Sequence, residues 1–293
     1  MQCVVVEDGV IKLTGGSASV TGTINADGTG VQNGGNAIVY ADNHLNFGGT
    51  ISAKGGELVG NGGFVDTSGK GSIAIAPTAK VLTTAVKGLT GTWLIDPANL
   101  EVVASGGNGT STVNASTIVT NLNTTSVNLQ ADNSITVNAA IDASGNTNAG
   151  KLTLTAPTAN LNQAIVLKTG STLSGTATTV NVGATGTVQN GIDVSAVSAA
   201  GGTVNLVAAT YKLTKEVGIN KNVTVRGAGA GSTTVSGNNT VRVFNIGGGK
   251  TLALDGISIV DGRDLGGGIF NYGTLTIGNS IVSGNTAPSG SEI

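Results

Sequence analysis

The chain has 293 residues, of which 39% are hydrophobic, 10% charged and 3% aromatic, and its formal net charge is -2. This composition is too apolar for a disordered chain, provides no basic field to hold nucleic acid, and supplies too few rings for a thick globular core. Its 48 glycines accompany only 4 prolines without a Gly-X-Y period, which excludes a collagen triple helix.

Signals for membranes, export and disulfides are also missing from the sequence. No apolar run approaches the ~20 residues of a membrane-spanning helix, so we expect no membrane insertion. The first residues, MQCVVVEDGV, lack the basic and long apolar regions of a signal peptide. Cys3 is the only cysteine, which rules out an internal disulfide. We therefore expect either an intracellular protein or a piece of a longer secreted chain.

Strand patterns occur along most of the chain, whereas helical spacing is almost absent. Short segments alternate apolar residues with Thr, Asn or Ser and end at Gly, Asn or Asp. The predicted strands lie at 36–41, 126–131, 151–156, 178–182, 202–208, 222–227, 242–246, 251–256 and 274–279, and Ile73 and Ile75 end another in the segment 62–75.

The spacing of these strands predicts the fold. Their starts are 25 residues apart from Ser126 to Lys151, 27 from Lys151 to Thr178, and 23 from Thr251 to Thr274. A loose period with strands and no helices predicts an all-β, right-handed, single-stranded parallel β-helix with about 20–27 residues per coil. A β-sandwich is the alternative, but it favours two-residue hairpins at shorter spacing.

A stack of coils explains the composition. A narrow interior suits Val, Ile, Leu, Ala and Thr, and corners suit Gly, Asn and Asp, which tolerate left-handed backbone angles. Asparagines at equivalent corners can form hydrogen-bonded ladders from coil to coil. The candidates are Asn138, Asn205, Asn245, Asn279 and Asn285.

The first hundred residues carry a family resemblance. The segments GGNAIVYADNHLNFGGTISAKGGELVGNGGFVDTSGKGSI and GTWLIDPANLEVV (91–103) resemble the repeats of filamentous haemagglutinin-type exoproteins, bacterial adhesins exported by two-partner secretion. In the second segment we expect Trp93 and Pro97 to pack over a coil edge, with Asp96 and Asn99 in a turn.

The last hundred residues resemble a related group. The segments AAGGTVNLVAATYKLTKEVGINKNVTVRGAGAGSTTVSG and GGGIFNYGTLTIGNSIVSGNTA are similar to pectate-lyase-like β-helices and to repeats of polymorphic outer-membrane proteins. We therefore expect haemagglutinin-like coils at 1–104, Thr- and Asn-rich coils at 105–195, and pectate-lyase-like coils at 196–293. Since nothing in these 293 residues resembles a secretion domain or a membrane barrel, we expect a fragment of a larger exoprotein or a truncated open reading frame.

Most motifs that suggest a cofactor or metal fail on inspection. GGGKT (247–251) has Phe244 where a phosphate loop needs its first glycine, and a strand follows instead of a helix. RGAGAGS (226–232) lacks the dinucleotide spacing, and GGNGTSTVN (106–114) has Ser111 where a calcium repeat needs Asp. The single histidine, His44, fits a solvated surface residue. We expect no cofactor and no metal.

The strongest enzymatic candidate is DGRDLGGG (261–268). Polysaccharide lyases and hydrolases on this fold cluster carboxylates with a basic residue, and here Asp261 and Asp264 bracket Arg263 with Asp255 close in sequence. Two Asp residues around an Arg in a Gly-rich loop are more often a self-neutralising surface turn. We therefore predict no enzymatic activity and keep these residues as an alternative.

The exposed polar residues leave two further interpretations open. Thr-rich segments such as NTTSV, TATTV and GSTTV resemble ice-binding arrays, although Thr also suits any exposed strand. Glycosylation sequons arise by chance in a chain this rich in Thr and Asn. They begin at Asn108, Asn114, Asn123, Asn222 and Asn238.

The resemblances imply a function. They indicate a structural and adhesive segment of a secreted or cell-surface bacterial exoprotein, in which stacked coils form a stiff rod that presents polar faces. The expected partners are glycans or proteins on host or neighbouring cells, and an outer-membrane transporter during export, with repeated weak contacts adding through multivalency. A polysaccharide-active enzyme and an autotransporter passenger are the alternatives.

Overall fold

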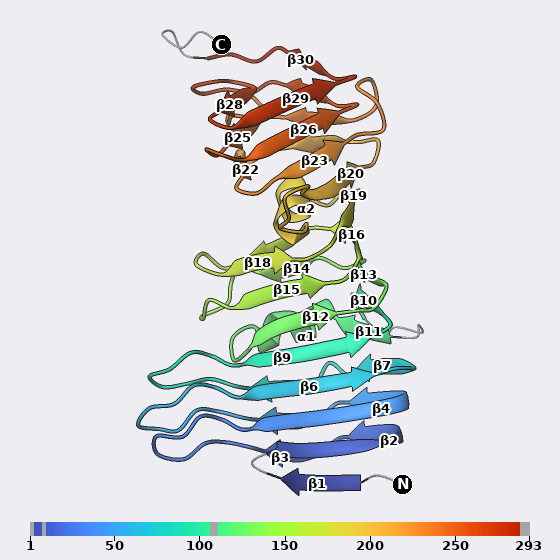
Figure 1. Cartoon of the computed structure of the whole chain (residues 1–293), viewed down its shortest axis with the longest axis vertical. Coiled ribbons are helices and arrows are strands. Elements are labelled where there is room, and N and C mark those ends of the chain that lie inside the picture. Colours follow the sequence, from blue (N-terminus) through green and yellow to red (C-terminus); the bar gives the residue numbers. More distant parts are fainter. Residues whose placement is uncertain (1–2, 8–9, 106–110, 288–293) are drawn as a thin grey trace. The chain divides into compact units, whose positions relative to one another are not determined.

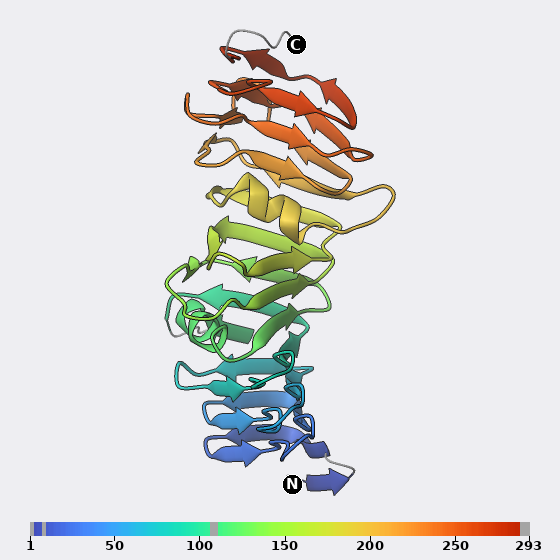
Figure 2. The same ribbon diagram turned by 90° about the vertical axis from the view of Figure 1, so that its left-hand side faces the viewer.

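The computed structural model describes residues 3–7, 10–105 and 111–287. The chain is nearly all β, with 5% helix, and its parallel strands stack in a β-solenoid of about ten turns. The prediction of a parallel β-helix is confirmed. Contacts divide the chain into unit 1, residues 1–157 with 165–174, and unit 2, residues 158–164 with 175–293. Figures 1 and 2 show the strands of successive coils stacked within each unit.

Unit 1 is built around one column of parallel strands. Each strand pairs with the equivalent strand of the next coil. The column contains β2 (Val10–Val20), β4 (Asn36–Phe47), β6 (Phe64–Gly69), β9 (Thr92–Pro97), β12 (Ser126–Gln130) and β15 (Lys151–Thr155).

Shorter strands complete the coils of unit 1. They are β3 (Thr23–Asn25), β5 (Thr50–Ser52), β7 (Ser72–Ile75), β8 (Lys80–Leu82), β10 (Asn99–Val103), β11 (Ser111–Asn114), β13 (Ser134–Val137), β14 (Ile141–Ala143), β17 (Ile165–Leu167) and β18 (Thr172–Gly175). Strand β1 (Cys3–Glu7) instead pairs antiparallel with β2.

The coils of unit 2 that begin at Gly202, Val223 and Thr251 have three strands each, as expected for a β-helix. The first column of this unit contains β16 (Thr158–Gln163), β19 (Thr179–Thr185), β20 (Gly202–Leu206), β23 (Val223–Arg226), β26 (Thr251–Asp255) and β29 (Thr274–Gly278). The second contains β21 (Thr210–Lys212), β24 (Thr234–Ser236), β27 (Ser258–Val260) and β30 (Ile281–Ser283). The third contains β22 (Val217–Ile219), β25 (Phe244–Ile246) and β28 (Ile269–Asn271).

The length of a coil varies more than the sequence period indicates. Residues paired across neighbouring coils are 34 apart at Trp93 and Val127 but 21 apart at Asn160 and Asn181. The predicted step from 151–156 to 178–182 is wrong, because β19 pairs with β16 and β15 pairs with β18. Strand β16, at 158–163, lies between the two predicted strands and was missed.

The interior consists of columns of aliphatic side chains. In unit 1, Ala37, Val65, Trp93, Val127 and Leu152 occupy matching positions of successive strands and are all buried. Because side chains alternate between the two faces of a strand, every second residue joins such a column. The thin aliphatic core expected from the composition is therefore present.

Trp93 corrects one expectation. Its side chain is fully buried in the core and does not cover a coil edge, and Asp96 and Asn99 belong to strands β9 and β10, not to a turn. The indole Nε1 donates a 2.9 Å hydrogen bond to Thr67 Oγ1, and the ring packs edge-on against Phe47 with centroids 6.0 Å apart. Buried Thr67 thus satisfies the one polar atom of the largest core side chain.

Two short helices replace strands. Helix α1 (Ala115–Asn121) lies in unit 1 and α2 (Val188–Val194) in unit 2. Asn121 of α1 accepts from the backbone N–H of Val81 and donates to the carbonyl of Ala79, at 2.7 and 3.0 Å. An amide side chain thus makes the bonds that a neighbouring strand would otherwise make to β8.

The Gly-rich loops of unit 1 stack as closely as the strands do. A Cβ atom at Gly63 would overlap the carbonyl oxygen of Gly35 in the preceding coil, and a Cβ at Gly91 would overlap that of Gly63. Glycine is required here for close backbone approach, even though these residues do not have a positive φ. The abundance of glycine is therefore partly a consequence of coil stacking.

We predict that Gly63→Ala lowers the free energy of unfolding by about 1–3 kcal/mol, because the added methyl forces two coils apart. The matched control is Gly145→Ala, where a Cβ would meet nothing within 4 Å, and its effect should stay within about 0.5 kcal/mol. Thermal or denaturant unfolding of both variants measures the difference. Equal stabilities would contradict the close stacking.

Candidate functional site

The structure separates the residues of the predicted carboxylate cluster. Asp261 and Asp264 lie in the loop between β27 and β28, and both have a positive φ. Asp261 Oδ2 accepts a 3.0 Å hydrogen bond from Ser236 Oγ, and Arg263 is exposed. Asp255, in β26, instead accepts from Asn279 Nδ2 at 2.8 Å. Neither Asp261 nor Asp264 forms an ion pair with Arg263 among the described residues.

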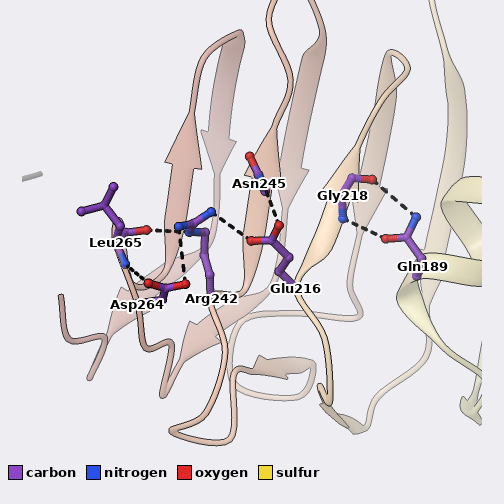
Figure 3. Close-up of polar contacts among 7 residues, drawn as sticks. All are labelled: Gln189, Glu216, Gly218, Arg242, Asn245, Asp264 and Leu265. Carbon is purple, nitrogen blue, oxygen red and sulfur yellow. Dashed lines mark hydrogen bonds and ion pairs between the residues drawn. The ribbon is translucent and has the colours of Figure 1, made fainter. Parts of the chain in front are cut away.

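Asp264 approaches a different arginine, which sequence reasoning missed. Arg242 Nη2 lies 3.8 Å from Asp264 Oδ2, and Arg242 Nη1 donates to Glu216 Oε2 at 2.9 Å (Figure 3). The Arg242 side chain is 9% exposed. Its Nε donates to the carbonyl of Leu265 at 2.6 Å, and the guanidinium lies 4.4 Å from the centre of the Phe270 ring.

The group formed by Glu216, Arg242 and Asp264 ties three successive coils of unit 2 together. Glu216 Oε1 also accepts from Asn245 Nδ2 at 2.8 Å (Figure 3). Glu216 and Arg242 are 26 residues apart, which is about one coil. Opposite charges at this spacing are the sequence signal that could have identified their ion pair. Because the guanidinium and both carboxylates are already paired, we assign this group a structural role.

The asparagine candidates form the ladder only in part. Asn205 Nδ2 donates to Asn181 Oδ1 at 3.0 Å, and Asn181 Nδ2 donates to Asn160 Oδ1 at 2.8 Å. This ladder lies within strands β16, β19 and β20, not at corners. The other candidates bond to different partners: Asn138 to Glu101, Asn245 to Glu216, Asn279 to Asp255, and Asn285 to the backbone of 259, 262 and 283.

The remaining motifs lie where a structural interpretation places them. His44 is exposed on β4, and its Nδ1 lies 2.7 Å from Ser72 Oγ. GGGKT forms a turn followed by β26, as expected. The sequon asparagine Asn114 is buried, whereas Asn108 lies outside the described residues. Among the described residues, no group of three or more His, Cys, Asp or Glu is placed to hold a metal ion.

Unit 1 carries half-buried carboxylates that the sequence analysis did not single out. Burial raises the pKa of Asp66, partly offset by a hydrogen bond from Ser68 and reinforced by the nearby charge of Asp96. Burial also raises the pKa of Asp96, against a 2.7 Å hydrogen bond from Gln130 Nε2. These groups take up protons in mild acid more readily than exposed aspartates do.

Unit 1 contains a small pocket lined by neutral residues. Its volume is about 170 Å³, and it lies beside the C-terminal end of α1. Hydroxyl and amide side chains line it, together with Leu122 and Ala149, and no charged residue does. The polar lining residues are Thr84, Thr90, Asn123, Thr125, Ser126 and Asn148.

Asn123 organises one wall of this pocket. Its Oδ1 accepts from Thr147 N, Thr147 Oγ1 and Asn148 N at 2.9, 3.1 and 3.2 Å. Asn148 Nδ2 donates back to the Asn123 carbonyl at 2.9 Å. A lining of hydroxyl and amide side chains without a charged residue suits a neutral, hydroxyl-rich group more than a charged one. The volume is below the ~300–1,000 Å³ of drug-sized sites, which restricts the occupant to about one sugar ring.

We predict that Arg242→Ala destabilises the protein by about 2–4 kcal/mol, because Glu216 and the Leu265 carbonyl lose their charged donor. Arg263→Ala is the matched control, at an exposed arginine in the loop that carries Asp264, and should change stability by less than about 0.5 kcal/mol. Chemical denaturation of both variants provides the measurement. Similar effects at the two positions would show that the group is not structural.

We predict that Asp66→Asn unfolds at a higher temperature than the native chain at pH 7. Since the pKa of Asp66 is raised in the folded state, the native chain loses stability as the pH rises from near 4 through that raised value. The advantage of Asn should therefore disappear toward pH 4.

The control is Asp142→Asn, which should have the opposite sign. Two hydrogen bonds from Ser144 lower the pKa of Asp142, so its charged form stabilises the fold above pH 4 and that stability is lost on acidification. Melting curves between pH 3 and 7.5 compare the two variants. A difference in melting temperature between Asp66→Asn and the native chain that does not change with pH would contradict the raised pKa of Asp66.

Across the described part of the chain, no helix has the length and hydropathy of a membrane-spanning segment.

Comparisons with known proteins do not identify a relative. No protein-family model matches the chain, and neither a curated protein nor a solved structure does so.

Proposed function

We propose that this chain is a structural and adhesive segment of a secreted bacterial surface protein, and that it attaches to neutral glycans. The proposal rests on the parallel β-solenoid together with the sequence resemblance to haemagglutinin-type exoproteins. The observation that carries the glycan part is the neutral pocket of unit 1, lined by hydroxyl and amide groups.

The polar groups of unit 2 support a structural role more than a catalytic one. A general acid or base must lie within reach of substrate and be free to exchange a proton. Asp264 instead faces the buried guanidinium of Arg242, and Asp261 accepts a hydrogen bond from Ser236. Export by two-partner secretion and display at a cell surface belong to the same proposal, and they follow from the resemblance alone.

Binding at the pocket should be weak for one sugar and stronger for a polymer. A pocket of this size contacts few groups of a ligand, so a single site gives modest affinity. Several copies displayed together would raise the avidity by ~10²–10⁴-fold over one site. Attachment by this chain is therefore expected to depend on polymeric or densely displayed glycan.

The pocket is tested by filling it. We predict that Ala149→Trp, which places a large ring at an exposed position of the lining, lowers binding to a neutral-glycan array or to glycan-coated cells at least tenfold. Ala200→Trp, at an exposed alanine of unit 2, is the matched control and should bind as the native chain does. Equal binding by both variants would remove the pocket from the proposal.

The enzymatic alternative is tested on the same material. Pectin, alginate and related polymers are incubated with the native chain, with and without calcium, and released oligosaccharide is measured. The proposal expects no turnover. Release that disappears in Asp261→Ala and in Arg263→Ala would overturn the adhesive proposal in favour of a polysaccharide-active enzyme.

A further inference from the structure

Three neighbouring, hydrogen-bonded loops of unit 1 each expose large aliphatic side chains. The loops span 28–35, 55–63 and 84–91, and each connects a short strand of one coil to the main column of the next coil. Figure 1 draws them at the left of the lower coils. Their exposed side chains form what we call the aliphatic ridge: Val31, Leu58, Val59, Val86 and Leu89, which are 65, 60, 47, 70 and 76% exposed.

Hydrogen bonds between the loops hold the ridge in place. The backbone N–H groups of Leu58 and Val59 both donate to the carbonyl of Gly30, at 2.9 and 3.3 Å. Leu89 N donates to Asn61 Oδ1 at 2.8 Å, and Gly62 N donates to the Leu89 carbonyl at 2.8 Å. A partner that binds the ridge therefore has little loop ordering to offset.

The ridge is unusual for a solvent-facing surface. Single exposed aliphatic residues are normal, but a contiguous apolar patch on a folded domain usually marks an interaction site. Two charged residues flank it: Glu57 on the second loop and Lys87 on the third, both exposed. Glu57 Oε2 accepts a 3.1 Å hydrogen bond from Gly30 N, while Lys87 takes part in no ion pair among the described residues.

We propose that the aliphatic ridge binds a second copy of this chain. In a two-fold, antiparallel arrangement, the second loop of each copy faces the third loop of the other. Leu58 and Val59 then pack against Val86 and Leu89 of the second copy, and Glu57 faces Lys87 twice.

Charge and spacing favour this occupant. The two-fold arrangement joins opposite charges on both sides of the apolar contact, which fixes its register. The formal net charge of -2 opposes self-association only weakly. Both ridges also share the spacing of stacked strands, ~4.8 Å, so their side chains can interlock. A different protein or a lipid surface would not need Glu57 and Lys87 on adjacent loops.

Sedimentation velocity of the full chain at several concentrations and ~0.15 M salt tests the proposal. The native chain should form a dimer. Leu58→Asp should weaken the dimer at least tenfold, whereas Val197→Asp, at a 78% exposed valine of unit 2, should leave it unchanged. Unchanged melting temperatures confirm that both variants fold.

Charge exchange tests the register. Glu57→Lys alone and Lys87→Glu alone should each weaken the dimer about tenfold, because each places like charges opposite one another. The double variant with both substitutions should return to within about threefold of the native dissociation constant. Restoration in the double variant is a result that a general loss of folding or solubility cannot produce.

Four results would overturn the proposal. A chain that is monomeric at every concentration has no such interface. A dimer that survives Leu58→Asp lies elsewhere, and its loss in Ile281→Lys would place it at β30. A double charge variant as weak as the single ones rejects the antiparallel register. Binding of vesicles by the ridge without a dimer would assign it to lipid.

Leu58 lies on a loop that lines no part of the pocket. Failure of dimerisation and failure of glycan binding are thus separable, because Leu58→Asp should still bind glycan in the array.

Discussion

The constraint on which the structure depends is the fixed spacing between coils, set by parallel backbone hydrogen bonds. Strands of adjacent coils lie ~4.8 Å apart, and each interior side chain must fit between its counterparts above and below. Valine, leucine, isoleucine and alanine satisfy that limit along both units. Trp93 satisfies it because Val65 and Thr67 of the preceding strand are small, and because Thr67 accepts the indole hydrogen bond.

The same spacing explains features that look unrelated in the sequence. Loops that stack with the coils need glycine where a Cβ would overlap a carbonyl, as at Gly63 and Gly91. A coil that contains a helix leaves backbone groups of the neighbouring strand without a ladder partner, and amide side chains take their place. Gln189 of α2 does so for Gly218, donating to its carbonyl and accepting from its N–H (Figure 3). Asn121 of α1 does the same for β8 and the preceding Ala79.

The sequence predicted the strands and the fold class because alternation and period are local properties of the chain. All nine predicted segments contain strand, and the steps from Ser126 to Lys151 and from Thr251 to Thr274 match the observed pairing of β12 with β15 and of β26 with β29. The site was predicted less well, because its contacts join different coils. Asp264 is adjacent in sequence to Arg263, yet its carboxylate lies 3.8 Å from Arg242 Nη2 of the preceding coil. The pocket and the aliphatic ridge likewise depend on loops 24 or more residues apart, whose register cannot be read without coordinates.

The most direct test of this account is the register between coils, on which the core, the pocket and the ridge all depend. His44 and Ser72 are paired residues of neighbouring parallel strands, with side chains 2.7 Å apart. In a chain with Cys3 replaced by serine, His44→Cys with Ser72→Cys should form a disulfide rapidly on mild oxidation without loss of melting temperature. Failure of this pair to form a disulfide in folded protein, with ready bridging of a pair shifted by several residues, would contradict the stacked parallel coils.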